Sequence, residues 1–188
     1  DLSRSIPAEA LTALRAAADG FAVQYQQTTD QARIAGLRKL AMDAARIEVN
    51  TERTMMESVR LIRIGPDEIM QHRDGISVND AFARFAVTFG LFDRNVFPPP
   101  GSTGNTQTLS RYEASTGSAN AMAWISTAGN SRTQQVQAGR AYVRTQLAGV
   151  PFGLGMQPLS QGIQEFPEMK SVYDQLHQAL VGKPASTE

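Results

Sequence analysis

The stretch from Gly139 to Met169 constrains the fold of this chain more than any other. It reads GRAYVRTQLAGVPFGLGMQPLSQGIQEFPEM. Its first part has the spacing of the end of a long helix, and the glycines that follow favour an exit from that helix. A short extended piece is expected at Gly155–Leu159, and Pro167 is expected to open a new helix, because proline suits the first helical turn. Such an exit leaves residues 158–160 on an open backbone that could receive the flat face or edge of a cofactor.

The composition argues against several classes of function. The 188 residues carry 18 basic and 18 acidic side chains, so no net charge favours nucleic acid or an anionic membrane. The chain has no cysteine, which removes disulfides, thiolate metal sites and cysteine nucleophiles. No apolar run approaches the ~18 residues of a membrane span, and the first residues lack the pattern of a targeting peptide. The sequence predicts one domain with its own core and neither a nucleic-acid partner nor a membrane span.

Periodic apolar positions predict six helices. They cover roughly residues 7–20, 28–47, 50–62, 79–89, 131–147 and 167–181. Thr28 and Gln31 have the spacing of a capping box at the start of the second helix. Other helix starts are expected at side chains that cap well, namely Asn50, Asn79, Asn130 and Ser131.

Three of these helices carry apolar faces. The face of the third helix consists of Met55, Met56, Val59 and Ile62, and we expect it to be buried. The face of the fourth consists of Phe82, Phe85, Ala86 and Phe89. Its helical spacing favours packing in a core or between domains, with lining of a cofactor cleft as the alternative. The stripe of the fifth helix consists of Val136, Gly139, Val143 and Leu147. Because glycine inside a helix costs about 1 kcal/mol relative to alanine, close packing against a strand or a ligand is expected at Gly139.

Strand patterns are short and few. One is expected at residues 21–25, and a clearer one at Ala119–Ile125, where Met122 and Trp124 alternate with small residues as in a strand covered on both faces. The segment 93–108 contains three consecutive prolines and is predicted to be a loop, either a functional lid or a solvated connector. Several helices around a few strands, without regular alternation, predict an α+β fold.

Common catalytic motifs are absent from the sequence. His72 and His177 lie far apart, and neither has a partner at metal-ligand spacing. There is no GxSxG elbow and no GxxxxGK[ST] phosphate loop. Gly153 and Gly155 lack the third glycine and the downstream acid of a dinucleotide-binding fingerprint. Residue patterns alone therefore lead to an α+β domain with one glycine-rich segment of interest.

Several segments together carry a resemblance to a known family. They are AMAWISTAGN, QAGRAYVRTQLAGVPFGLGMQPLSQ and EFPEM, with ESVRLIRIGPDEIMQHRDGIS and GLFDR before them. In combination they resemble the C-terminal half of nitroreductase-like flavoproteins, and more narrowly a bacterial branch of Tat-exported nitroreductase-like proteins. The resemblance runs from Asp1 to about Val181.

The resemblance implies a nitroreductase-like α+β fold, with helices around a small, mainly antiparallel sheet and FMN bound between two related halves. In this family the residues after a GLG-x-x-P motif approach the isoalloxazine ring. The matching positions, which become the candidate cofactor-binding residues, are Gly155, Met156, Gln157, Pro158, Leu159, Ser160 and Gln161. Backbone N–H groups there would donate to acceptors of the flavin ring and favour hydride acceptance. No side chain is expected to be catalytic, and the periplasm or cell envelope is the compartment that the resemblance suggests.

The chain also departs from the family. It has neither an H-N-x-Q-P-W motif nor an arginine-rich tail after the last helix, so it resembles one half of a protein about twice as long. The phosphate-binding residues are consequently not identified, and Arg140 and Arg144, one helical turn apart, are expected to pair on the helix surface. The residues from about 50 to 92 look like a helical insertion before the loop at 93–108.

Three functions follow as hypotheses. The first is an FMN-dependent oxidoreductase that passes two electrons from NAD(P)H to a nitro or quinone-like acceptor. The second is a flavin-sequestering protein with little turnover, in which the 50–92 insertion and the 93–108 loop cover the ring. The third is a degenerate half that packs against a partner half, from the same polypeptide or a homodimer, and adds only a wall to the site.

Overall fold

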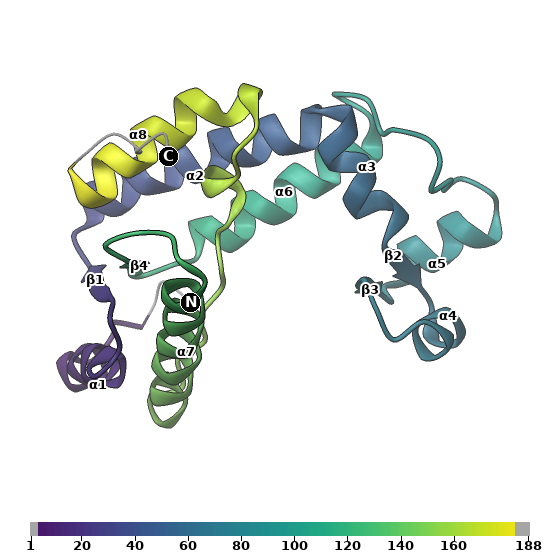
Figure 1. Cartoon of the computed structure of the whole chain (residues 1–188). Coiled ribbons are helices and arrows are strands. Elements are labelled where there is room, and N and C mark those ends of the chain that lie inside the picture. The colour runs from purple at the N-terminus through teal and green to yellow at the C-terminus, as the bar shows by residue number, and fades with distance from the viewer. Residues whose placement is uncertain (1–3, 183–188) are drawn as a thin grey trace. The chain divides into compact units, whose positions relative to one another are not determined.

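The computed structural model describes residues 4–182 as a helix-rich α+β chain (Figure 1). Its helices and strands, in order, are α1 (Ala8–Ala18), β1 (Gln24–Thr28), α2 (Gln31–Asn50), α3 (Glu52–Arg60), β2 (Ile62–Ile64), α4 (Pro66–Gln71), β3 (Ile76–Val78), α5 (Ala81–Thr88), α6 (Thr103–Gly117), β4 (Met122–Ser126), α7 (Arg132–Gly149) and α8 (Lys170–Val181). Short 3-10 turns occupy η1 (Val150–Phe152), η2 (Gln161–Ile163) and η3 (Pro167–Met169). The chain forms two compact units, unit 1 with residues 1–44 and 113–188 and unit 2 with residues 45–112.

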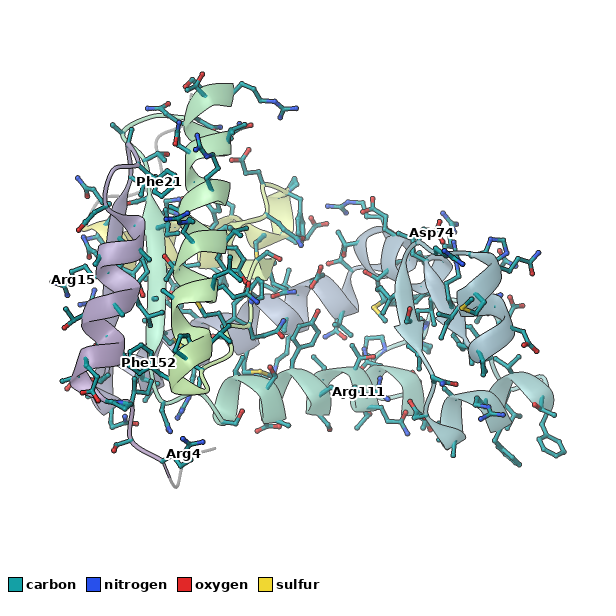
Figure 2. The ribbon with its side chains drawn as sticks, turned by 90° about the horizontal axis from the view of Figure 1, so that it is seen from below. Arg4, Arg15, Phe21, Asp74, Arg111 and Phe152 are labelled. Carbon is teal, nitrogen blue, oxygen red and sulfur yellow. The ribbon has the colours of Figure 1, made fainter. Side chains whose placement is uncertain are left out.

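Unit 1 is built around the packing of α1 against α7, which run side by side in opposite directions (Figure 2). The buried residues of α1 are Ala10, Leu14 and Ala18, and those of α7 are Ala141, Thr145 and Gly149. Both sets recur every four residues, so each helix presents one ridge of mostly small side chains to the other. This spacing leaves the stripe of α7 that begins at Val136 on a different face.

The only sheet found among the described residues of unit 1 is the antiparallel pair β1–β4, in which Tyr25 stands opposite Ile125. Arg33 of α2 lies over the ring of Trp124 at 4.7 Å from its centroid. Arg38, also on α2, donates to the backbone oxygens of Thr116, in the last turn of α6, and of Ala119, just after that helix. These contacts fix the place where the chain leaves α6 and enters β4.

Unit 2 has its own apolar core. The buried residues are Val49, Met55, Met56 and Val59, and partly buried Phe92, Phe97, Leu109 and Tyr112 pack against them. The strands β2 and β3 form a parallel pair. Gly75, at the turn before β3, has a φ of +71°, and a Cβ there would lie 2.2 Å from the backbone oxygen of Leu61. Only glycine fits this turn.

Glu68 ties β2 to the loop that follows α5. Its carboxylate accepts the backbone N–H of Ile64 at 2.8 Å and pairs with Arg94, whose Nε also donates to the oxygen of Ile62. The backbone hydrogen bond from Ile64 and then the charge of Arg94 hold the pKa of Glu68 below its ordinary value, against an opposing effect of burial.

The helix predictions are confirmed in outline, and several of their details are wrong. The second helix is capped by Asp30, which accepts from the N–H of Arg33, and not by a Thr28–Gln31 box. Asp80 rather than Asn79 caps α5. Thr51, not Asn50, stands at the start of α3, because α2 continues through Asn50. Ser131 does cap α7, in a complete capping box with Gln134.

The strand and loop predictions need larger corrections. The first strand is shifted to Gln24–Thr28, and β4 covers Met122–Ser126. β4 pairs with β1 alone among the described strands and leaves Ala123 exposed, so it is not covered on both faces. Residues 103–108, predicted as loop, form the first turns of α6. Ile62 lies in β2 rather than on the buried face of α3, and the strand pairs are one antiparallel and one parallel.

The apolar faces of α5 and α7 are exposed rather than packed within the chain. Phe82, Phe85 and Phe89 expose 53%, 51% and 65% of their surface, and no residue of α5 is buried. Packing of these phenylalanines in a core is therefore not found among the described residues, and packing between domains stays a prediction. The helix instead turns its smaller residues Ala83 and Ala86 inward.

Candidate functional site

The predicted cofactor segment, Gly155–Gln161, is anchored at its first end on α7. Gly153 adopts the left-handed conformation, with a φ of +66°, and its N–H donates to the oxygen of Val150. The N–H of Leu154 donates to the oxygen of Gly149 at 3.0 Å. These two bonds close the end of the helix, so the glycine-rich exit expected from the sequence is confirmed.

The other end of the segment is anchored on α8 and α2. Gly162, in η2, is buried, and a Cβ added there would lie 2.9 Å from Cδ2 of Leu176 and 3.6 Å from Cβ of Ala44. Any side chain at this position would force the end of the Leu176 side chain to shift. The backbone from 155 to 160 is thus held at both ends by positions that depend on glycine.

Between the anchors the segment is open. Residues 154–160 belong to no helix or strand, so the short extended piece expected at Gly155–Leu159 is not part of a sheet. Gly155, Gln157, Pro158, Leu159 and Ser160 are exposed, while Met156 and Gln161 are half-buried.

The segment also has unused hydrogen-bond donors. The N–H groups of Gly155, Met156, Gln157, Leu159 and Ser160 donate to no acceptor within residues 4–182. An exposed segment with this row of donors is suited to bind the acceptor-rich edge of a planar ring.

The side chains that follow the segment suggest no acid–base or metal chemistry. Tyr173 donates to Glu165 at 3.3 Å, and burial, followed by the charge of Glu165, raises the pKa of Tyr173. The ring of His177 lies against that of Tyr173, and its Nδ1 is 2.9 Å from the oxygen of Tyr173. Across the described part of the chain, no group of three or more histidine, cysteine or acidic side chains could hold a metal ion.

A second feature of unit 1 is an open hollow on the outer face of α7. Its volume is about 540 Å³, and its lining consists of Phe21, Val136, Gly139, Arg140, Val143 and Arg144. Val136, Gly139 and Val143, from the exposed stripe of α7, form its floor. No described atom lies within 4 Å of a Cβ built on Gly139, and close packing of that glycine within the chain was therefore a wrong prediction.

The hollow lies over the middle of α7, from Val136 to Arg144, and the cofactor segment follows the C-terminal end of that helix. Figure 2 shows Phe21 near one end of the α1–α7 pair and Phe152, just before the segment, near the other. Arg144, the last residue of α7 that lines the hollow, is five residue steps or about 7.5 Å of helix from Gly149, and the hollow and the segment share no residue. The two features are separate sites.

Arg140 and Arg144 do not form the helix-surface pairs that the sequence predicted, within the part of the chain that the structure describes. The guanidinium of Arg140 lies 5.4 Å from the centroid of the Phe21 ring, and within the described residues neither Arg140 nor Arg144 forms an ion pair. The sequence already indicated that these arginines lack acidic partners nearby in the chain, since residues 114–164 contain three arginines and no aspartate or glutamate.

Comparison of the chain with protein-family models, curated proteins and solved structures found no match. None of the helices within residues 4–182 has the length and apolar character needed to cross a membrane.

Proposed function

We propose that the chain is part of an FMN-dependent oxidoreductase of the nitroreductase type, with residues 155–161 against the flavin ring. The observation that carries the proposal is a row of five N–H groups that donate to no acceptor within residues 4–182, on a largely exposed segment that is held at both ends. Resemblance of the 153–161 sequence to the nitroreductase family is the independent support.

The backbone donors of the segment fit the acceptors of a flavin ring. A flavin ring offers carbonyl and nitrogen acceptors along one edge, and the N–H groups of Gly155, Met156 and Gln157 donate to no acceptor within residues 4–182. When bound, FMN supplies two-electron chemistry, taking hydride from NAD(P)H and reducing a nitro or quinone-like acceptor. The chain would position the ring and stabilise negative charge on it through backbone dipoles.

The test begins with FMN uptake by the protein. We expect the FMN-loaded protein to be yellow and to bleach on addition of NAD(P)H. Ser160→Trp places a bulky ring on the exposed segment and should weaken FMN binding at least about tenfold, whereas Ala35→Trp, at an exposed position of α2, should leave it unchanged. Protein that takes up no FMN at micromolar concentration would refute the proposal.

Turnover distinguishes the oxidoreductase from the other two hypotheses. Reduction of a nitroaromatic by FMN-loaded protein, well above the rate with free FMN, is the expected result. Tight FMN binding without turnover would instead support the flavin-sequestering hypothesis. If Ser160→Trp leaves the FMN affinity unchanged, the segment is only a packing wall, as the third hypothesis holds.

A further inference from the structure

The hollow on the outer face of α7 has the properties of a ligand site, and none of them depends on FMN. Its volume of about 540 Å³ lies within the range of roughly 300–1,000 Å³ typical of small-molecule sites. Its floor is apolar, since Val136 and Val143 expose 54% and 52% of their surface. Phe21 forms an aromatic wall, in a turn closed by the bond from its N–H to the oxygen of Ala18.

The space in the hollow depends on Gly139. A glycine in the interior of an exposed helix costs about 1 kcal/mol relative to alanine, and packing within the chain does not explain its presence. Any longer side chain at this position would extend into the hollow.

The charge of the hollow is positive and unbalanced. Arg140 and Arg144 are both exposed and stand one helical turn apart, an arrangement that destabilises a helix by about 0.2–0.5 kcal/mol. α7 carries no acid, and the acids of the neighbouring α1 segment, Glu9 and Asp19, make no ion pair with either arginine. An anionic group in the hollow would relieve this repulsion.

We propose that this hollow binds a small organic anion with a flat aromatic body. The body lies on the floor formed by Val136, Gly139 and Val143 and against Phe21, and the anionic group pairs with Arg140 and Arg144. Guanidinium groups suit both parts of such a ligand, because they bind carboxylate, sulfonate or phosphate oxygens and also stack on aromatic faces.

Three probes test how much the aromatic ring and the anionic group each contribute to binding. Naphthalene-2-sulfonate has both the ring and the charge, naphthalene-2-sulfonamide has the ring alone, and inorganic sulfate has the charge alone. By isothermal titration calorimetry at low salt, we expect the sulfonate to bind at least about fivefold more tightly than either of the others. Its affinity should fall as sodium chloride is added, because the ion pairs are exposed to solvent.

Variants then locate the site. Arg140→Gln and Arg144→Gln should each weaken sulfonate binding about threefold to fivefold, the upper range for an exposed ion pair. Arg132→Gln removes the same charge from the first turn of α7, where the side chain bonds Gln135, and should change the affinity less than twofold. Equal weakening by Arg132→Gln would mean nonspecific attraction and would overturn the proposal.

The hollow can also be filled without removing any charge. Gly139→Leu should abolish sulfonate binding while the helix remains folded, since no described atom beyond the adjoining backbone of α7 lies within 4 Å of the new Cβ. Gly36→Leu, at an equally unobstructed position of α2, is the matched control and should bind like the unmodified protein. Circular dichroism checks that both variants fold.

Two further results would overturn the proposal. One is unchanged sulfonate binding in Gly139→Leu. The other is a dimer in sedimentation experiments that binds no sulfonate and that Val143→Asp dissociates, because the face would then be an interface between copies of the chain.

Discussion

Alanine substitutions at three helical glycines test whether the outer face of α7 is open or closely packed. At Gly139 a Cβ meets no described atom within 4 Å, so Gly139→Ala gains helix propensity and loses nothing. The expected gain in the free energy of unfolding is about 1 kcal/mol, or a rise in Tm of roughly 2–4 °C for a chain of this size. Gly36→Ala should give the same gain, because its Cβ is equally unobstructed.

Gly149 provides the opposite case on the same helix. A Cβ there would lie 3.2 Å from Cβ of Leu154 and 3.5 Å from Cδ2 of Leu14, in the buried contact between α7 and α1. Gly149→Ala should therefore lower the free energy of unfolding by about 1 kcal/mol, since the crowding outweighs the smaller propensity gain at a helix end. Each of the three changes adds one methyl group, at an open site for Gly139 and Gly36 and at a crowded site for Gly149.

Urea denaturation followed by the fluorescence of Trp124 is a suitable assay. Trp124 is the only tryptophan and lies in unit 1, as do all three glycines. The free energies should rank Gly139→Ala and Gly36→Ala above the unmodified protein and Gly149→Ala below it. A loss of stability in Gly139→Ala would refute the reasoning, because it would mean that atoms press on this glycine as the sequence first suggested.

Two predictions concern unit 2. Gly75→Ala should lower the free energy of unfolding by more than about 2 kcal/mol, because its Cβ would overlap the oxygen of Leu61. Gly90 also has a positive φ but no described atom within 4 Å of a Cβ, so Gly90→Ala should lose only about 1 kcal/mol. Equal losses in circular-dichroism melts would contradict the steric argument. Folding lowers the pKa of Glu68 from its ordinary value of 4.5, so the ionised carboxylate should stabilise unit 2 at pH values above 4.5. This contribution should be lost as the pH falls through the lower pKa of the folded state. In acid titrations followed by circular dichroism, Glu68→Gln should flatten the fall in stability below about pH 5 while Glu57→Gln should not, and the same slope in both would rule out this role for Glu68.

The local signals in the sequence were sufficient to place most helices. The Ser131 cap, the stop at Gly20 and the exit at Gly153 all depend on a few adjacent residues, and the structure has each of them. Caps were misplaced by one or two residues at Asp30 and Asp80, because several good capping side chains stand next to one another in the sequence.

The burial of apolar faces could not be predicted in the same way. Periodicity identifies which side chains share a face of a helix, but it does not say whether another part of the chain covers that face. The face of α3 is buried, with Met55 and Val59 in a core, whereas those of α5 and α7 are exposed. The hollow was missed for a related reason, since it joins Phe21 to a helix that begins more than a hundred residues later.

The absence of acids from residues 114–164 has a consequence for how the α7 surface responds to its surroundings. This stretch also lacks histidine, lysine and cysteine, so its charge comes from arginines alone, and arginine side chains stay protonated in proteins. Any anion attracted to the hollow would therefore meet a lining of constant charge from mildly acidic to mildly alkaline solution. Occupancy would then follow the ionisation of the ligand and the concentration of competing salt.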